Sequence, residues 1–274
     1  MKTNISIMIP SSLTIESPDP RIKTYKVGQI ARAASIFGVT NIFIYRDTKL
    51  DDSRFIEEVL KYVETPQYLR KRLFPLKDEL KYVGTIPPLR TPHHPLKQKL
   101  KDLKVGTYRE GAVVSMIGEG AKVDIGMEGL AVLHMCDKIR KNDRLTLKIT
   151  SISPLEVEVA DREDIPFYWG YETKTTGRLG KTISRFSDEK IVLTSRLGEI
   201  VSVDKMQEIL SERVLFVFGP PNRSVEEILR EENLSTEDFS STVLNTIPNQ
   251  NTATVRTEEA IFATLSVYNS FRAL

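Results

Sequence analysis

Two segments near the carboxyl end join a hydrophobic strand directly to a helix through a loop rich in Gly, Pro, Asn and Thr. They are residues 214–223 (VLFVFGPPNR) and residues 245–260 (NTIPNQNTATVRTEEA). The continuous β-branched and aromatic run that opens the first segment is typical of a strand buried on both faces of a parallel sheet. Ser224 and Glu227 then predict a capping box at the start of a helix. Because open α/β sheets bind ligands at the carboxyl ends of their strands, we expect the two loops to form one binding site.

The remainder of the chain alternates strands and helices as in a parallel sheet. Strands are expected at residues 4–9, 41–45, 191–198, 214–218 and 243–246, and helices at 21–37, 51–63 and 257–271, with a short basic helix after Thr65. The five strands come from both sides of an interruption. The sequence therefore predicts an α/β domain that is discontinuous along the chain.

The interruption begins at residues 86–95, where four prolines predict a semi-rigid connection. Residues 111–134 then alternate apolar residues with regularly placed glycines, and residues 145–159 continue as a hairpin. This pattern predicts a small OB-type barrel. Residues 111–160 contain no Phe, Tyr or Trp, and base stacking needs such rings. Backbone contact with RNA and mere steering of the substrate geometry both stay open for this barrel.

Several other site classes are not expected. Cys136 is the only cysteine, which excludes a disulfide framework and a thiolate metal cluster. His93, His94 and His134 lack the spacing of metal ligands, so we expect no metal. Residues 177–182 (GRLGKT) resemble a phosphate-binding loop without its first glycine, and we expect no strand leading directly into them.

Hydropathy and charge also constrain the protein. No apolar run is long enough to span a bilayer, and the amino terminus lacks a signal-peptide layout, so a soluble cytoplasmic protein is expected, or a nuclear or nucleolar one in a eukaryote. Residues 67–104 carry ten Lys or Arg against three acids, whereas residues 199–274 carry twelve acids against six bases. Basic surfaces of this kind bind phosphate backbones, although a solvated helix face is the alternative. The expected RNA-binding residues are Arg70, Lys71, Arg72, Lys97, Lys99 and Lys101.

The tail described first resembles that of the SPOUT class of S-adenosylmethionine-dependent RNA methyltransferases, whose C-terminal segment forms a trefoil knot. The resemblance extends to residues 6–12 (SIMIPSS) and 19–34 (DPRIKTYKVGQIARAA), and it covers nearly the whole chain. The most similar subgroup, found in archaea and eukaryotes, carries an OB-like domain inserted into the SPOUT domain. The resemblance implies a SPOUT-like domain at residues 1–92 and 163–274 and an inserted domain at residues 104–160.

Methyl transfer from S-adenosylmethionine to RNA, either ribosomal or transfer RNA, is the activity that this resemblance implies. Holding the cofactor and the acceptor in line would provide most of the rate gain. The expected cofactor-binding residues are Leu193, Thr194, Ser195, Phe218, Gly219, Pro220, Leu244, Asn245, Thr246, Ile247, Pro248, Gln250, Thr252 and Thr254. Gly219 is expected to let the cofactor approach the backbone closely.

Arg21, Arg196 and Arg223 are the candidate catalytic residues, since a guanidinium can orient phosphate or stabilise negative charge on an acceptor oxygen. Structural salt bridges are the alternative for all three. Related enzymes complete the site with a second subunit, so the resemblance also implies a homodimer packed through helix 257–271. The apolar positions considered for this contact are Ala260, Ile261, Thr264, Leu265, Tyr268 and Phe271, and they could equally face the chain's own sheet.

Two other functions stay open at this point. One is a non-catalytic RNA-binding or assembly protein that retains the knotted fold. The other is a different nucleotide-using enzyme, such as a ligase or an NAD-dependent enzyme. The target RNA, the nucleotide and the methylated atom are not specified by the sequence.

Overall fold

The computed structural model describes residues 4–95, 100–134 and 138–272, and the chain divides into two compact units. The sheet unit comprises Met1–Lys61, Glu79–Pro87 and Tyr171–Leu274. The barrel unit comprises Tyr62–Asp78 and Pro88–Gly170. Each unit therefore draws on segments that are distant in the sequence.

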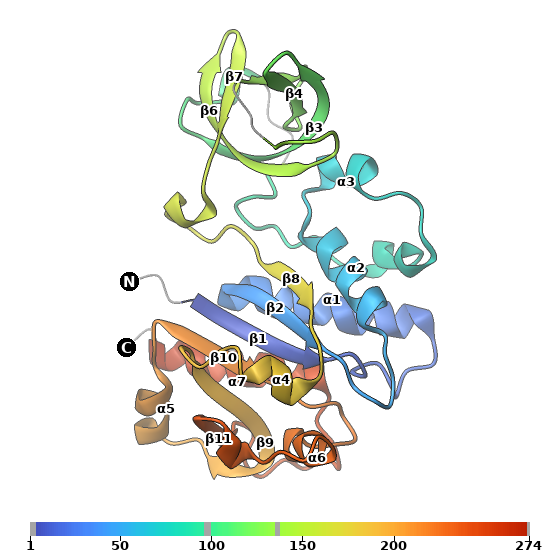
Figure 1. Ribbon diagram of the computed structural model, residues 1–274, viewed down its shortest axis with the longest axis vertical. Helices are drawn as coiled ribbons and strands as arrows, with labels where there is room; N and C mark the ends of the chain where they lie inside the picture. Colours follow the sequence, from blue (N-terminus) through green and yellow to red (C-terminus); the bar gives the residue numbers. More distant parts are fainter. Residues whose placement is uncertain (1–3, 96–99, 135–137, 273–274) are drawn as a thin grey trace. The chain divides into compact units, whose positions relative to one another are not determined.

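A six-stranded, fully parallel sheet forms the centre of the sheet unit (Figure 1). Its strands are β1 (Asn4–Pro10), β2 (Val39–Tyr45), β8 (Glu172–Thr175), β9 (Lys190–Ile200), β10 (Arg213–Val217) and β11 (Ser241–Asn245), in the order β11-β9-β10-β1-β2-β8. The predicted parallel α/β sheet is thus confirmed.

Strand β8 was not predicted, because its sequence ETKT is polar and its residues alternate between exposed and half-buried at the sheet edge. It ends two residues before Gly177, so the expectation that no strand leads into residues 177–182 is wrong. The helix that follows, α4 (Leu179–Ile183), has five residues. That is shorter than the helix that follows the strand and loop of a nucleotide-binding P-loop.

Helices cover both faces of the sheet. They are α1 (Pro20–Phe37), α2 (Ser53–Glu64), α4, α5 (Val203–Ile209), α6 (Val225–Glu231) and α7 (Thr257–Arg272), with short 3₁₀ turns at Asp78–Leu80, Val83–Thr85 and Thr236–Asp238. Helix α1 begins at the cap Asp19, whose side chain accepts a hydrogen bond from the Arg21 amide, and ends at Gly38 with φ 72°. Glycine suits that left-handed position. Helices α1 and α7 pack together, and the Tyr268 ring meets Phe216 of β10 at 5.1 Å.

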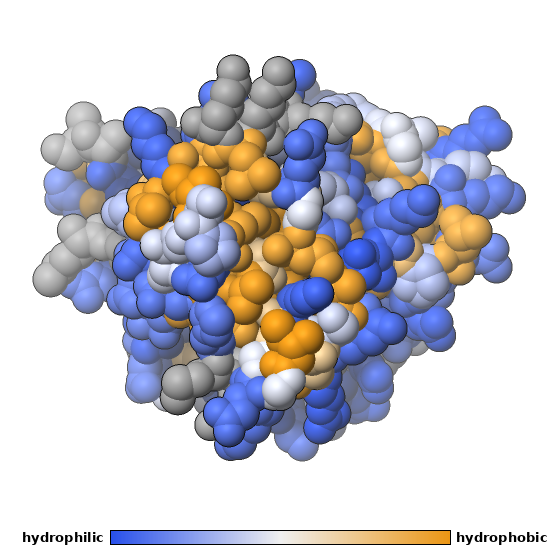
Figure 2. Space-filling view, turned by 90° about the horizontal axis from the view of Figure 1, so that it is seen from above, coloured by the Kyte–Doolittle hydropathy of each residue, from blue (hydrophilic) through white to orange (hydrophobic). Residues whose placement is uncertain are grey.

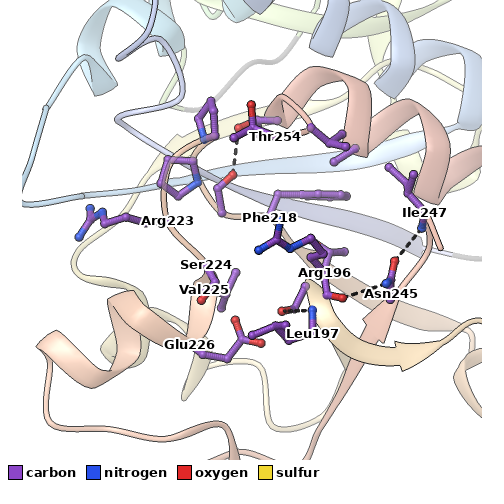
Figure 3. A pocket seen from close by; sticks show the side chains of 18 of the residues that line it. Arg196, Leu197, Phe218, Arg223, Ser224, Val225, Glu226, Asn245, Ile247 and Thr254 are labelled. Atoms are coloured by element: carbon purple, nitrogen blue, oxygen red, sulfur yellow. Dashed lines mark hydrogen bonds between the residues drawn. The ribbon is translucent and has the colours of Figure 1, made fainter. Parts of the chain in front are cut away.

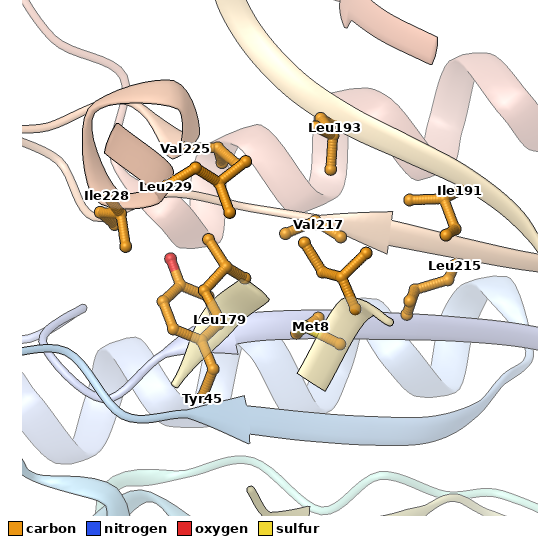
Figure 4. Packing of buried hydrophobic residues seen from close by; sticks show 11 residues of the cluster. Met8, Tyr45, Leu179, Ile191, Leu193, Leu215, Val217, Val225, Ile228 and Leu229 are labelled. Atoms are coloured by element: carbon orange, nitrogen blue, oxygen red, sulfur yellow. The ribbon is translucent and has the colours of Figure 1, made fainter. Parts of the chain in front are cut away.

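The opposite face of the sheet packs against α4 and α6 (Figure 4). Met8 of β1 and Leu215 and Val217 of β10 lie against Leu179 of α4 and Leu229 of α6, all of them buried. Each such buried side chain contributes roughly 1.5–3 kcal/mol relative to its exposed state. This packing fixes the strand ends from which the carboxyl-edge loops start.

Five strands close into a small barrel in the barrel unit, in the order β3-β4-β5-β7-β6. They are β3 (Tyr108–Ile117), β4 (Gly120–Asp124), β5 (Ala131–Leu133), β6 (Arg144–Ile152) and β7 (Leu155–Val159), accompanied by helix α3 (Gln67–Leu73) and 3₁₀ turns at Leu100–Asp102 and Arg162–Asp164. A side chain at Gly120 would meet the Leu133 carbonyl oxygen at 2.4 Å, so glycine is required there. The predicted small closed barrel is confirmed.

Beside the barrel, the buried carboxylate of Glu64 is the centre of a polar network. Arg144 forms ion pairs with both Glu64 and Glu110, and His93 Nε2 lies 3.0 Å from Glu64 Oε1. Burial alone would raise the pKa of Glu64, but Arg144 and His93 lower it to about 2. Nε2 of His94 lies 2.5 Å from the Glu64 carbonyl oxygen. Both histidines therefore make structural contacts in this network.

Apolar side chains also reach the surface of the barrel unit. Val105, Met116, Ile117, Leu130 and Val159 are between 39% and 61% exposed. Figure 2 shows hydrophobic residues gathered in the middle of the face seen from above, with hydrophilic residues around them. Exposed apolar surface of this kind is common where another molecule binds. Within the described ranges, no helix is long and apolar enough to cross a membrane.

Candidate functional site

A pocket of about 590 Å³ lies where β9, β10 and β11 end in the sheet unit. A bulge in β9 opens one side of it: Val243 of β11 pairs with Leu193, but the next residue, Leu244, pairs with Glu199. Residues 194–198 are therefore displaced from the ladder, and residues 194–197 line the pocket. Local disruption of this kind is typical of strands next to binding sites.

The loop after β11 forms a largely uncharged wall that is held by its own hydrogen bonds. The Asn245 side chain donates to the Arg196 carbonyl at 2.9 Å and accepts from the Ile247 amide at 3.0 Å. The hydroxyls of Thr246 and Thr264 lie 2.7 Å apart, which ties the loop to α7. Figure 3 shows Asn245 and Ile247 on the same side of the pocket. These bonds order the wall before any ligand enters.

The turn after β10 forms the floor, and its backbone is fixed from several directions. The Phe218 carbonyl accepts a hydrogen bond from the Tyr45 hydroxyl at 3.0 Å, and the Gly219 carbonyl accepts one from the Thr257 hydroxyl at 2.9 Å. A side chain at Gly219 would meet the Arg223 carbonyl oxygen at 2.9 Å. Glycine is thus required by the turn itself, a reason that differs from the one predicted from the sequence.

Arg223 is engaged away from the centre of the pocket. Its Nη2 pairs with Asp47, which also accepts from the Ser12 hydroxyl, and its Nη1 donates to Glu231 at 2.7 Å. Figure 3 shows its side chain pointing away from the other labelled residues. Burial would raise the pKa of Asp47, but the hydrogen bonds from Arg223 and Ser12 lower it below its ordinary value. The structure thus gives Arg223 a salt-bridge role.

Helix α6 supplies a charged wall. The Ser224 hydroxyl accepts from the Glu227 amide at 3.2 Å, and the Glu227 carboxylate accepts from the Ser224 amide at 2.7 Å, so the predicted capping box is confirmed. Glu226 and Arg230 also line the pocket. Oε2 of Glu226 is buried without a hydrogen-bond partner. Among the described residues, neither Glu226 nor Arg230 has an ion-pair partner.

The bulged part of β9 closes the remaining side. Thr194 is anchored by a hydrogen bond from its hydroxyl to the Val217 carbonyl at 2.9 Å. The Leu197 amide donates to the Ser195 hydroxyl at 3.2 Å, while the Leu197 side chain is 83% exposed at the rim. Arg196 is exposed, with Nη1 3.5 Å from the Ala253 carbonyl. Its guanidinium thus remains accessible to a ligand.

Most of the residues predicted as cofactor-binding or catalytic come together here. Those that line the pocket are Thr194, Ser195, Arg196, Phe218, Gly219, Pro220, Arg223, Leu244, Asn245, Thr246, Ile247, Gln250 and Thr254. Leu193 lies in the hydrophobic core, and Pro248 and Thr252 are not among the lining residues. Arg21 lies in the first turn of α1, 5.4 Å from the Tyr82 ring, and is also not a lining residue.

The residues of the α6 wall are not among the site residues predicted from the sequence. The additional lining residues are Leu197, Pro221, Asn222, Ser224, Val225, Glu226, Glu227, Arg230, Ala253, Val255, Thr257 and Ala260. The capping box placed a helix start directly after the first loop, and that signal could have directed attention to Glu226. By itself, that signal indicates only a structural cap.

The predicted RNA-binding residues differ in whether their side chains already contact other residues of the chain. Arg70 donates to the Thr65 and Val63 carbonyls, and Arg72 pairs with Asp124 at 3.4 Å. Lys71 is exposed. Lys97, Lys99 and also Cys136 lie outside the described residues, as does the side chain of Lys101.

Helix α7, which is expected to form a homodimer contact, buries much of its apolar face within its own chain. Ile261, Thr264, Leu265 and Tyr268 of α7 are buried within the chain itself, and Ala260 lines the pocket. Of the two orientations considered from the sequence, these positions face the chain's own sheet and pocket. Phe271 is half-buried.

Comparison with known proteins gives matches along nearly the whole chain. A family model described as "Putative RNA methyltransferase" matches residues 4–268. An uncharacterized protein of Halobacterium salinarum is 34% identical over 283 residues, covering 95% of this chain and 96% of the relative. The 28S rRNA (uridine-N(3))-methyltransferase of Mus musculus is 29% identical over 299 residues, covering 96% of this chain and 75% of the relative.

Among solved structures, the SpoU methyltransferase AviRb from Streptomyces viridochromogenes in complex with the cofactor AdoMet is similar at a TM-score of 0.40 and 8% identity. The match covers 100% of this chain and 59% of that chain.

Proposed function

Because the chain belongs to the RNA methyltransferase family whose model spans residues 4–268, we propose that it transfers a methyl group from S-adenosylmethionine to a uridine of ribosomal RNA. The observation that carries the proposal is the pocket at the ends of β9, β10 and β11, with an uncharged wall opposite a charged one. The name of the mouse relative supports ribosomal RNA and uridine N3 as the acceptor. Transfer RNA, the other acceptor considered from the sequence, is an outcome of the test.

The residues of the uncharged wall fit the adenosyl part of the cofactor. Leu244 and Phe218 are buried apolar surfaces, while the loop after β11 supplies backbone groups and the amide of Gln250. Small-molecule sites commonly combine apolar walls with a few polar groups in volumes of roughly 300–1,000 Å³. When bound, the cofactor supplies a methyl group on a positively charged sulfur. The chain would hold it through residues 194–195, 218–220 and 244–247, together with Gln250 and Thr254.

Of the predicted catalytic set, Arg196 is the arginine that is exposed and also lines the pocket. We assign it to the RNA, where its guanidinium would hold a phosphate next to the acceptor nucleotide. Arg223 would instead maintain the turn after β10 through Asp47. Lys71 would add a phosphate contact from the barrel unit, and the barrel would be OB-like, a proposal supported by its closed five-strand order.

We further propose that the C-terminal segment threads through a loop as a trefoil knot. Support comes from β11, which follows β10 in sequence but lies on the far side of β9 in the sheet. The proposed domain boundaries are residues 1–92 with 163–274 and residues 104–160. A crystal structure with bound cofactor would trace the segment directly.

A homodimer is proposed through α1 and α7. The exposed apolar residues of α1, Ile22, Tyr25 and Ile36, lie at helical spacing and are half-exposed or more. Sedimentation analysis of the protein and of Tyr25→Glu tests this arrangement. A monomer at micromolar concentration would refute it.

Calorimetric titration with S-adenosylmethionine and S-adenosylhomocysteine tests the cofactor assignment. Thr254 is exposed and lines the pocket, so Thr254→Trp should fill it and weaken binding at least about tenfold without loss of folding stability. Thr252→Trp is the matched control, because Thr252 is exposed on the same loop but is not a lining residue. Equal weakening by both variants would contradict the assignment of this pocket.

Methyl transfer to RNA is measured separately with tritiated S-adenosylmethionine and nucleoside analysis. Binding of RNA without methyl transfer would favour the alternative, a non-catalytic RNA-binding or assembly protein. Binding of ATP or NAD in place of S-adenosylmethionine would favour a different nucleotide-using enzyme.

A further inference from the structure

Two charged side chains on the α6 wall have no partner in the described part of the chain. Glu226 and Arg230 both line the pocket, and at a spacing of four residues they lie on the same face of the helix. Val225, Ile228 and Leu229 bury the other face in the core. The two side chains are thus held beside each other by a helix that is anchored from behind.

The other charged residues of the pocket either have partners within the chain or belong to an element other than α6. Arg223 is bound to Asp47 and Glu231, and Glu227 to the backbone of Ser224. Arg196 comes from a different element, β9. Glu226 therefore provides the free carboxylate of the α6 wall, and Arg230 provides its free guanidinium.

A buried carboxylate oxygen without a hydrogen bond raises the free energy of the folded protein, because it loses its hydrogen bonds to water and forms none within the protein. Oε2 of Glu226 is such an atom. Figure 3 places Glu226 and the exposed Leu197 on the same side of the pocket. A ligand that enters the pocket beside Glu226 and offers an N–H group would satisfy this oxygen.

We propose that Glu226 and Arg230 bind the Watson–Crick edge of a uracil-type base and that Glu226 accepts its N3 proton. This inference rests on the proposed function and adds the residues that recognise the acceptor. Uracil presents an N3–H donor between the acceptors O2 and O4. An ionised carboxylate accepts the N–H, and an arginine donates to a neighbouring oxygen. Cytosine has a lone pair at N3, which a carboxylate repels.

The proposed step is balanced without any further reagent. The N3–H proton passes to the Glu226 carboxylate, and the electron pair left on N3 forms the new bond to the methyl carbon. The methyl–sulfur bond breaks and its pair stays on sulfur. The products are N3-methyluridine, S-adenosylhomocysteine and a proton, which leaves Glu226 for solvent. Arg230 stabilises the negative charge that develops on the uracil oxygen during proton transfer.

Glu226→Gln, Arg230→Gln and the matched control Glu237→Gln test the proposal. Glu237 is exposed and is not a lining residue. Each protein is titrated with S-adenosylhomocysteine and assayed with tritiated S-adenosylmethionine and an unmodified large-subunit rRNA transcript of Halobacterium salinarum. Circular dichroism verifies that each variant is folded.

Glu226→Gln is expected to bind S-adenosylhomocysteine within about threefold of the parent protein but to methylate uridine about 10²-fold more slowly at neutral pH. Its rate should rise about tenfold per pH unit between about pH 7 and 9, because solvent then removes the N3 proton, whereas the parent rate stays flat. A merely structural role would not produce this difference. Arg230→Gln should slow transfer without changing the pH profile, and Glu237→Gln should match the parent.

Four results would overturn the assignment. Transfer by Glu226→Gln within about threefold of the parent would remove the proton-accepting role. Loss of S-adenosylhomocysteine binding in this variant would place Glu226 against the cofactor instead. Methylation by the parent of a nucleoside other than uridine would refute the uracil assignment while leaving a methyltransferase. If the parent binds the cofactor but methylates no RNA, the proposed function itself is refuted, together with the role of Glu226.

Discussion

Replacing Arg223 with methionine is expected to destabilise the sheet unit by about 3 kcal/mol, because the buried carboxylate of Asp47 loses its cation. The side chain of Arg223 is 12% exposed and that of Asp47 is 1% exposed. Removing one partner of a buried ion pair costs roughly 3–5 kcal/mol. The lower end applies here, since Asp47 keeps its hydrogen bonds from Ser12 and from the Lys49 amide. The pair with Glu231 is at the surface, where water screens it.

The pH dependence of the unfolding free energy gives a second test of the Arg223–Asp47 ion pair. The pKa of Asp47 in the folded parent is below its ordinary value of 3.8. The stabilisation is therefore complete above that ordinary value and is lost as the pH falls through the lower folded pKa. In Arg223→Met, burial dominates and should raise the folded pKa instead. The difference in unfolding free energy between parent and variant should thus shrink below about pH 4.

Urea unfolding followed by circular dichroism measures both effects. The double variant Asp47→Asn with Arg223→Met is the control, and it should recover part of the loss because no charge is left buried. A loss below about 1 kcal/mol in Arg223→Met at neutral pH would refute the reasoning. A variant of full stability that cannot transfer methyl groups would restore the catalytic interpretation of Arg223.

Other predictions concern the turn, the buried network and the RNA surface. Gly219→Ala should lower the free energy of unfolding by roughly 1–3 kcal/mol in thermal unfolding, because the added methyl group would meet the Arg223 carbonyl oxygen. Gly84→Ala is the control: no atom lies within 4 Å of its added methyl group, so the free energy of unfolding should change by less than about 0.5 kcal/mol. Because the folded pKa of Glu64 is about 2 against an ordinary 4.5, the parent should lose about 3 kcal/mol of stability as the pH falls between those values. Glu64→Gln should lack this dependence in urea unfolding, and retention of the parent slope would contradict it. Lys71→Gln should reduce the salt slope of RNA binding by about one in filter-binding assays. An unchanged slope would remove Lys71 from the RNA surface.

Much of the framework could be predicted because its signals are local. Continuous apolar runs mark the central strands, Gly38 marks the end of α1, and the Ser224–Glu227 spacing marks the start of α6. Glycine spacing indicated the closed barrel. Strand β8 gave no such signal, since a polar edge strand needs only its hydrogen bonds to β2.

The charged half of the site depends on contacts between residues distant in sequence. Arg223 and Asp47 are 176 positions apart, and nothing in either neighbourhood indicates that they pair. Sequence reasoning consequently left Arg223 open between catalysis and a salt bridge. It missed Glu226 because a carboxylate in the first turn of a helix is ordinarily a favourable capping charge. The lack of a partner for that carboxylate becomes visible only once the pocket is assembled.

The displaced segment of β9, residues 194–198, contains pocket positions whose side chains can be exchanged without changing the pairing of β9 with β11. Ladder pairing is maintained before the segment at Leu193 and after it at Glu199, so changes between them leave the strand register intact. Gly198 is the exception, because a side chain there would meet the Leu244 backbone at 2.8 Å. Exchanges at Arg196 and Leu197 should therefore alter acceptor preference at little cost in folding stability. This segment is the natural position for redirecting the enzyme toward another nucleotide.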